Sequence, residues 1–511
     1  MYCRSILVLM LIVLKTSNVA SDDFSTAVSF DSAVEAATAI ETLNPDAGFD
    51  LPGAVLLEDS VLYADSVYRH FYYAVPLSYE SGTPAPLMMW LHGGVSTQEL
   101  SDYEPEVLTE WHLIPGILDM GCILVFPCAQ SGAVWWDLVG QQGIMDIIAT
   151  LKHRLNIDDS RVFVGGFSDG ASGSWALMML QPSPFAGYLA FSGHLGVAAI
   201  HGDRATYLSC LSNRPGIASH TDDDGLYPSS VMAPSVELAQ EAGAEIAYHT
   251  FEGYGHDADY LPLLEEDVMI FIDTTFRERF PEHLIWRTGE PSGCDWLMVD
   301  SIIPWPVLTE DTDHNMVLVS ERLTIGFMPD WEAEGDGIPV AQVLDGDTPA
   351  NRIELKADDV IIGFQDCPVM DLEDLFEVMS EMSPGDHFTM NVDRGGEQIH
   401  LTGNFNPPEY YWLFPRSKPS VRVDAVYAGN FFDIEVNRLC VLRLLLHPDM
   451  IDPDREVTVL CNGIEIYRGF VEMNSEMAID TYARTGDRQR PWAGELVLDL
   501  EELMLPRLAN P

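Results

Sequence analysis

The sequence predicts an α/β fold, a doubly wound sheet of mainly parallel strands, followed by two smaller β-rich modules. Apolar strand candidates alternate with helical patterns across roughly residues 70–275, which is typical of a sheet covered by helices on both faces. Beyond residue 305 this alternation stops, and short strand patterns separated by Gly and Pro follow. The 511 residues suffice for more than one domain, because a single core rarely grows beyond about 300 residues.

Several apolar runs are strand candidates in the first region. The run Pro86–Leu91 is apolar throughout, as expected of a strand buried on both faces. The strand candidates are Tyr68–Val75, Pro86–Leu91, Cys122–Pro127, Arg161–Gly165 and Glu245–Thr250. Helical patterns between them cover Gly143–Leu155, Gly173–Leu180 and Ser235–Ala242.

Changes in composition divide the chain into consecutive segments. The Pro- and Gly-containing stretches around residues 290–305 and 406–419 indicate connectors. We predict a signal peptide (1–21), a lead-in (22–60), an α/β domain (61–290), a linker (291–314), a first β-rich module (315–405) and a β-rich C-terminal domain (420–505). The C-terminal domain contains a hairpin signal, Asn462-Gly463, inside the strand pattern Val457–Tyr467.

The N-terminus has the pattern of a secretory signal peptide. Arg4 precedes the apolar run Ile6–Leu14, and small residues follow around Val19–Ser21. We therefore expect a secreted, periplasmic or cell-envelope protein, with an uncleaved N-terminal anchor as the alternative. The run is too short to span a bilayer, and the rest of the sequence has no long uncharged apolar stretch. We expect no transmembrane helix in the mature protein.

The charge of the chain restricts its partners. Eighty acidic residues against 26 basic ones give a formal net charge of −54, which repels nucleic acids and anionic lipid surfaces. The eight cysteines contain no CxxC pair and no Cys/His spacing suited to zinc. We expect no nucleic-acid partner, no metal and no cofactor, and the sequence leaves disulfide pairing open.

The motif with the clearest chemical meaning is Gly166-Phe167-Ser168-Asp169-Gly170, a G-x-S-x-G sequence. It follows the strand candidate Arg161–Gly165 and precedes a helical run. A serine on such a sharp strand-to-helix turn exposes its hydroxyl, and the glycines avoid clashes with the neighbouring strand and helix. Ser168 is therefore the candidate nucleophile.

A nucleophilic serine requires a base, and the base requires a carboxylate that orients it. His256 lies in a Gly-rich loop just after a strand candidate, whereas His249 lies inside that strand and is expected to serve packing. His256 is the candidate base. The acid is expected within Asp222-Asp223-Asp224; we favour Asp224 and keep Asp222 and Asp223 as alternatives.

An oxyanion hole requires two backbone N–H donors that face the charge developing in the transition state. The residue after the nucleophile, Asp169, supplies one candidate. The loop Leu91-His92-Gly93-Gly94-Val95 directly follows a buried strand candidate and supplies the second, from Gly94 or Val95. We expect His92 to support this loop rather than react. Trp135 and Trp136 could line a substrate pocket or belong to the core.

The stretch from Pro86 to His256 resembles the esterase, phospholipase/carboxylesterase and polyhydroxybutyrate-depolymerase-like group of α/β-hydrolases. The phrases WLHGG, GGFSDGASGSW, FAGYLAFSGH and HTDDDGLYP carry the resemblance. It implies acyl transfer through a serine acyl-enzyme, with Ser168, Asp224 and His256 as the triad and without a metal. The short spacings between these residues leave little room for a large lid, which favours an esterase over a lidded lipase.

Residues 317–403 resemble a PDZ domain of the kind attached to bacterial proteases. The sequence Leu323-Thr324-Ile325-Gly326-Phe327 matches the loop that captures a terminal carboxylate, and Asp371–Met382 matches the groove-lining helix. The resemblance implies a peptide C-terminus as a partner, with Thr324, Ile325, Gly326 and Phe327 as its binding loop. Such a peptide adds a strand to an open sheet edge. A PDZ fold kept only as a spacer is the alternative.

The C-terminal residues, with the phrase VTVLCNGIEIYRG, resemble a small β-sandwich found after such hydrolases in exported bacterial proteins. The sequence assigns this module no chemistry. Three functions remain in view: an exported carboxylic-ester hydrolase, a serine peptidase to which the PDZ-like module delivers chain ends, and a peptide-binding scaffold that has lost activity. The complete set of triad candidates argues against the third.

Overall fold

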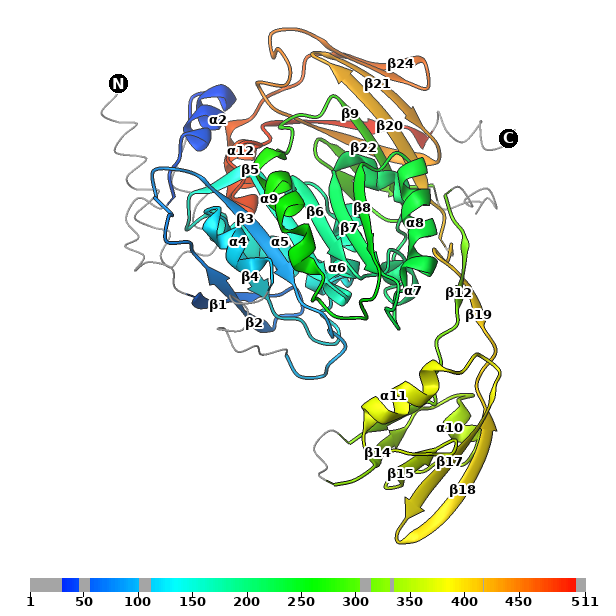
Figure 1. Ribbon diagram of the computed structural model, residues 1–511. Coiled ribbons are helices and arrows are strands. Elements are labelled where there is room, and N and C mark those ends of the chain that lie inside the picture. Colours follow the sequence, from blue (N-terminus) through cyan, green and yellow to red (C-terminus); the bar gives the residue numbers. More distant parts are fainter. Residues whose placement is uncertain are drawn as a thin grey trace. The chain divides into compact units, whose positions relative to one another are not determined.

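The computed structural model describes residues 30–45, 56–100, 112–303, 314–330, 335–416 and 418–501 (Figure 1). The predicted signal peptide lies outside these residues. The chain forms two units: the second unit is Val317–Trp412, and the first unit consists of the residues before and after it.

A mixed eight-stranded sheet is the centre of the first unit (Figure 1). From edge to edge its strands are β1 (Leu56–Leu62), β2 (Tyr68–Ala74), β4 (Ile123–Pro127), β3 (Ala85–Leu91), β5 (Ile157–Phe167), β6 (Gly187–Phe191), β7 (Gly216–Thr221) and β8 (Ile246–Phe251). Strands β4, β3 and β5 to β8 are parallel, whereas β2 is antiparallel to both of its neighbours. The predicted α/β fold class is confirmed.

Helices pack on both faces of this sheet. Neighbouring residues of a strand point to opposite faces. In β6, Leu189 shares a core cluster with residues of α4 and α9, whereas the ring of Tyr188 contacts Trp175 of α6. The helices are α4 (Ile114–Asp119), α5 (Leu138–Lys152), α6 (Asp169–Leu180), α7 (Val197–Ile200), α8 (Ser229–Glu241) and α9 (Glu265–Thr274), with the 3₁₀ turns η2 (Leu208–Asn213) and η3 (Leu261–Leu264).

Two further sheets complete the first unit. One has the order β10 (Ser292–Cys294), β11 (Leu297–Ile302), β22 (Leu439–Leu446) and β25 (Gly494–Asp499). The other has the order β24 (Ile464–Gly469), β23 (Val457–Cys461), β21 (Phe431–Val436), β20 (Val421–Ala428) and β9 (His283–Thr288). Trp296 joins the two sheets, because its ring contacts Tyr427 and Phe432.

The β-rich tail therefore does not stand apart from the residues that precede the second unit. Residues 292–302, expected within a linker, form β10 and β11, and β9 pairs with β20 of the tail. Helix α12 (Ser475–Thr485) packs on α2 (Ala33–Glu41) near the start of the described chain. Tail residues also enter buried ion pairs: Arg277 binds Asp487 at 2.7 Å. These contacts make the tail part of the first unit.

The second unit contains a strand pair and a small sheet with two helices. Strands β12 (Val317–Ser320) and β19 (Glu409–Trp412) pair with each other. The sheet has the order β13 (Phe327–Pro329), β14 (Ile338–Val343), β15 (Val360–Phe364), β17 (His387–Arg394) and β18 (Glu397–Asn404), with β16 (Cys367–Pro368) beside β15. The helices are α10 (Pro349–Arg352) and α11 (Leu372–Ser380). Asp371 caps α11 by accepting the Asp374 N–H, so the helix predicted over Asp371–Met382 is present.

Candidate active site

Ser168 lies on a sharp turn between β5 and α6, with φ 58° and ψ −120°. Its N–H donates to the carbonyl of Phe191 at the end of β6, at 2.9 Å. The flanking glycines make the turn possible: a Cβ on Gly166 or Gly170 would stand 2.4 or 1.9 Å from the carbonyl oxygen of Leu91. The local sequence therefore places the serine, which is partly buried, in a strained backbone conformation.

The three predicted triad residues meet at one edge of the sheet. Nε2 of His256 lies 2.8 Å from Oγ of Ser168, and Nδ1 lies 2.8 Å from Oδ2 of Asp224. Each residue follows the C-terminal end of a strand: β5 for Ser168, β7 for Asp224 and β8 for His256. Because these strands are parallel, their C-terminal ends lie at the same edge and bring distant residues together.

Asp224 is the carboxylate that faces the imidazole. Its Oδ1 accepts the N–H groups of Leu226 and Tyr227 at 2.7 and 2.8 Å. Burial acts to raise the pKa of Asp224, but the hydrogen bonds from His256 and these N–H groups outweigh burial and lower it. Asp224 is thus held as an anion, the form that stabilises an imidazolium.

The two alternative acids occupy other positions. Oδ1 of Asp222 accepts the Gly253 N–H at 2.7 Å, which ties the strand end to the loop that carries His256. The side chain of Asp223 is exposed. His249 lies within β8, where Nε2 is 3.6 Å from Asp267 and the ring stacks on Phe251. None of the three contacts Ser168 among the interactions of the described residues.

The HGG loop after β3 is held by the ring of His92. The Ala129 N–H donates to Nε2 at 3.0 Å, so the proton of the neutral ring is on Nδ1, which donates to the carbonyl of Gly93 at 2.7 Å. Burial lowers the pKa of His92 to about 4, which keeps the ring neutral. The indole N–H of Trp135 donates to the carbonyl of His92 at 2.9 Å. His92 therefore supports the loop.

The predicted oxyanion donors lie close to the serine. A Cβ on Gly93 would stand 3.2 Å from Cβ of Ser168, so the loop passes directly beside the nucleophile. Gly94 has φ 66°, in the left-handed region that favours glycine. The N–H of Val95 donates to Oδ2 of Asp169 at 3.1 Å. Gly94 and Val95 were the alternative second donors, and the N–H of Val95 is already hydrogen-bonded to the Asp169 side chain.

Two aromatic side chains adjoin the site: the sequence gave Tyr227 no role and left Trp135 open between a substrate pocket and the core. Tyr227 contacts the His256 ring edge-on, with ring centroids 5.7 Å apart. Trp135 is fully buried and contacts the His92 ring at 5.0 Å, so it supports the loop rather than lining an open pocket. The position of Tyr227 three residues after Asp224 was the one available signal. For Trp135, the sequence offered only its place in the aromatic pair Trp135-Trp136.

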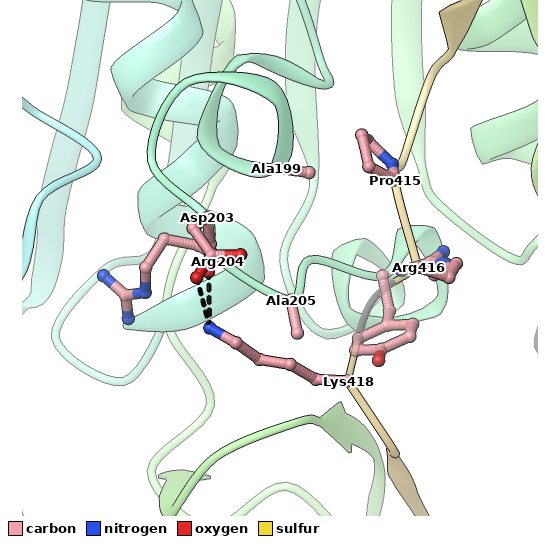
Figure 2. A pocket seen from close by; sticks show the side chains of 8 residues that line it. Ala199, Asp203, Arg204, Ala205, Pro415, Arg416 and Lys418 are labelled. Atoms are coloured by element: carbon pink, nitrogen blue, oxygen red, sulfur yellow. Dashed lines mark hydrogen bonds and ion pairs between the residues drawn. The ribbon is translucent and has the colours of Figure 1, made fainter. Parts of the chain in front are cut away.

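A pocket in the first unit lies elsewhere (Figure 2). There, the segment returning from the second unit, with Arg416 and Lys418, lies against the loop after α7. Lys418 binds Asp203 with Nζ to Oδ2 at 3.0 Å, and Arg204 binds Glu290 at 2.6 Å. None of the triad residues lines this pocket. The Lys418–Asp203 pair links the returning segment to the loop after α7, whereas neither member of the Arg204–Glu290 pair belongs to that segment.

The described part of the chain contains neither a metal-ligating group of side chains nor a membrane-spanning helix. Within it, no group of three or more His, Cys, Asp or Glu side chains is arranged to hold a metal ion. No helix of these residues has both the length and the apolar character needed to cross a bilayer. The seven cysteines that they include are free thiols.

The predicted peptide-binding loop, Thr324 to Phe327, leads into β13 of the second unit. Gly326 has φ 94°, and its carbonyl accepts the Leu344 N–H at 3.0 Å. Strand β13 stands at the edge of the described sheet. Ile325 shares a hydrophobic cluster with Leu375 and Met379 of α11. The loop, the edge strand and the helix are thus neighbours, as peptide addition to a sheet edge requires.

Comparisons with known proteins agree with this architecture. Residues 141–275 match the family model described as phospholipase/carboxylesterase, and residues 320–402 match that of the PDZ domain. The bifunctional acetylxylan esterase/xylanase XynS20E of Neocallimastix patriciarum is 29% identical over 115 residues. That alignment covers 21% of this chain and 16% of the relative, so the chain spans a small part of the relative's length.

Solved structures with partial similarity include three hydrolases. A thermostable esterase is 20% identical, with a TM-score of 0.36, over 43% of this chain and 63% of that one. The acylaminoacyl peptidase of Pyrococcus horikoshii is 14% identical, with a TM-score of 0.36, over 45% and 43% of the two chains. The S-formylglutathione hydrolase of Agrobacterium tumefaciens is 14% identical, with a TM-score of 0.35, over 44% and 96%.

The family matches and the observed sheets confirm the resemblances to an α/β-hydrolase and to a PDZ domain. The chain has an α/β-hydrolase-like region of a serine-hydrolase type, in which residues 141–275 match the phospholipase/carboxylesterase model, together with a PDZ domain and a β-rich C-terminal region.

Proposed function

We propose that this protein is an exported serine hydrolase that cleaves carboxylic esters through Ser168, His256 and Asp224. The observation that carries the proposal is the unbroken chain of contacts from hydroxyl to imidazole to carboxylate, each 2.8 Å long. This arrangement suits a serine that loses its proton to a neighbouring base. Export is supported by the signal-peptide pattern of residues 1–21.

In the proposed reaction, Oγ of Ser168 attacks the ester carbonyl while Nε2 of His256 accepts the hydroxyl proton. The tetrahedral intermediate collapses when the C–O bond to the leaving group breaks and His256 returns the proton to the leaving alcohol. Water then attacks the acyl-enzyme, with His256 again as base, and the carboxylic acid departs. Asp224 holds the imidazole and stabilises its charged form. The N–H groups of Asp169 and Gly94 stabilise the oxyanion.

The substrate is proposed to be a neutral ester. Exposed carboxylates of Asp222, Asp223 and Asp257 lie within two residues of the acid or the base, and the net charge is −54. This field disfavours anionic substrates. The partial similarity to an acetylxylan esterase supports small acyl groups on carbohydrate hydroxyls as the first class to test.

A serine peptidase is the second candidate, and the PDZ domain favours it. A PDZ domain that binds a peptide C-terminus raises the local concentration of that chain at a linked active site. Turnover of peptide amides that depends on a free C-terminal carboxylate would select this candidate over the ester hydrolase.

A panel of p-nitrophenyl esters, acetylated sugars and peptide amides tests the proposal, together with a fluorophosphonate label located by mass spectrometry. The wild-type protein should hydrolyse esters and carry the label on Ser168. Ser168→Ala should lose both. Ser212→Ala serves as the matched control, because this partly buried hydroxyl donates only to a nearby carbonyl, that of Ser209. Absence of turnover and of label in the wild-type protein would refute the proposed function and favour a scaffold.

A further inference from the structure

The side chain of Asp169 connects the two segments that supply the proposed oxyanion donors. Its Oδ2 accepts the N–H of Val95 at 3.1 Å, across 74 residues of sequence. Asp169 is the first residue of α6 and follows the nucleophile directly. Its backbone N–H is one proposed donor, while its carboxylate fixes the loop that supplies the other. Asp169 thus contributes to both proposed oxyanion donors, to one through its backbone and to the other through its side chain.

The loop is fixed from its other end by His92. The ring donates to the Gly93 carbonyl through Nδ1, at 2.7 Å. In a trans peptide the carbonyl and the following N–H point in opposite directions. The orientation of the Gly93 carbonyl therefore sets the direction of the Gly94 N–H. Gly94 lies between the two anchors, with the left-handed φ of 66°.

We propose that the Asp169 carboxylate is a positioning residue, which anchors Val95 so that the Gly94 N–H is the second oxyanion donor. This inference rests on the proposed function of the same site. A loop of two glycines has many backbone conformations, and an anchor on each side limits them before the substrate arrives. Preorganised donors stabilise a developing charge without reorganisation during the reaction. The assignment also separates Gly94 from Val95, which the sequence left open.

The proposed role requires an acceptor at this place rather than a negative charge. An asparagine side chain has the same length and presents a carbonyl oxygen to Val95. Alanine presents no acceptor, so the Val95 N–H would lose its partner. Comparing Asp169→Asn with Asp169→Ala therefore separates hydrogen bonding from charge.

Steady-state kinetics on a p-nitrophenyl ester give the first test. Asp169→Ala should lower kcat about 10–100-fold, which does not exceed the fall in kcat expected when one oxyanion donor is removed. KM should change less than about threefold. The alanine variant should also bind a trifluoromethyl ketone, an oxyanion-forming inhibitor, more weakly by a similar factor. Asp169→Asn should recover most of the lost kcat. Equal losses in both variants, or a loss confined to KM, would overturn the proposal.

Amide hydrogen exchange gives a second test that needs no turnover. The peptide that contains Val95 should exchange faster in Asp169→Ala than in the wild-type protein and in Asp169→Asn. Asp371→Ala is the matched control: this aspartate also accepts an N–H at a helix start, that of Asp374, but in the second unit. Should the alanine variant misfold, Asp169→Ser takes its place in both tests, because the serine side chain is shorter than that of aspartate. Unchanged exchange at Val95 would overturn the proposal.

The two tests separate failure of the inference from failure of the proposed function. A wild-type protein without ester turnover or fluorophosphonate labelling refutes the proposed function, and the exchange experiment still decides whether Asp169 anchors the loop. An active wild-type protein whose alanine variant keeps its kcat refutes the inference alone.

Discussion

Ser168, the proposed nucleophile, has a backbone conformation that most residues avoid. At φ 58° and ψ −120° its backbone is strained. The strain persists because the surrounding contacts leave no alternative: the Ser168 N–H donates to Phe191, and helix α6 begins at the next residue. Strain maintained by its surroundings is typical of functional sites, which is consistent with the proposed nucleophile.

The proposed role of Asp224 as the triad acid predicts a large kinetic effect. Asp224→Asn should lower kcat about 10³–10⁴-fold, because an amide stabilises the imidazolium poorly and favours the wrong tautomer of His256. The measurement is kcat for a p-nitrophenyl ester, with circular dichroism to verify folding. Asp223→Asn is the matched control, since the neighbouring carboxylate is exposed. A loss of activity in the control instead would assign the acid to Asp223.

Buried neutral histidines predict how stability depends on pH. Burial lowers the pKa of His220 to about 4, from the usual 6.5. Between pH 6.5 and 4 the unfolded state binds a proton that the folded state excludes, so the free energy of unfolding should fall as pH falls. One such group contributes a slope of about 1.4 kcal/mol per pH unit.

Urea unfolding at several pH values measures this slope. His220→Gln should reduce it by the contribution of one histidine. The substitution is expected to lower stability at pH 7 as well, because His220 bonds the carbonyl of Gly193 at 2.7 Å. An unchanged slope would show that His220 is not the titrating group.

At the scale of elements, the contact between β3 and α6 decides how the site is built. Gly170 lies in α6, and a Cβ there would stand 1.9 Å from the Leu91 carbonyl oxygen of β3. Gly170→Ala should therefore lower the free energy of unfolding by about 3 kcal/mol or more, as overpacking does. Gly82→Ala is the control, because nothing lies within 4 Å of its added Cβ. Equal urea midpoints for both variants would contradict the close approach.

The elements differ in how well the sequence predicted them. The Asn462-Gly463 turn between β23 and β24 is confirmed, with φ 50° and 76° as this dipeptide favours. Strands β6 and β7 were not predicted as separate strands; β7 consists largely of small residues, and both strands begin with a glycine. Packing selects those residues: a Cβ on Gly216 of β7 would stand 2.3 Å from the ring of Tyr188 in β6. Tertiary contact, rather than local propensity, defines these strands.

At the scale of the molecule, buried charges join the C-terminal tail to the α/β domain. Asp487 of the tail binds Arg277 at 2.7 Å, and Arg488 binds Asp159 at 3.1 Å. Burial acts to raise the pKa of Asp487, but Arg277, Lys152 and Arg490 outweigh burial and hold the pKa well below its usual value. These contacts account for the single unit formed by segments far apart in sequence.

Breaking one of these pairs should destabilise the protein strongly. Arg277→Met leaves the Asp487 charge buried with fewer partners, at a cost of about 3–5 kcal/mol in the free energy of unfolding. Adding Asp487→Leu should recover part of that loss. Arg468→Met is the control, because its pair with Glu465 is exposed and should leave the unfolding midpoint unchanged. A double variant no more stable than Arg277→Met would refute the coupling.

The second unit should be removable without loss of the first. The Leu413 N–H donates to the Met316 carbonyl at 2.9 Å. The two residues of the first unit that flank the inserted segment Val317–Trp412 are therefore in contact. Joining residues 316 and 413 through a short Gly-Ser linker should preserve the unfolding temperature of the first unit and its ester turnover within about twofold. Loss of turnover on small esters would show that the PDZ domain has a role in the ester chemistry.

The sequence alone determined the fold class, the PDZ resemblance and the candidates Ser168 and His256, and it limited the acid to the run Asp222–Asp224, because each of these depends on local pattern. Strand and helix periodicity, a G-x-S-x-G turn and residues after strand ends are readable within short windows. Tertiary structure decided the contact of imidazole with both partners, the engagement of Val95 by Asp169 and the union of the tail with the α/β domain. These depend on distances between segments that only the packed sheet brings together.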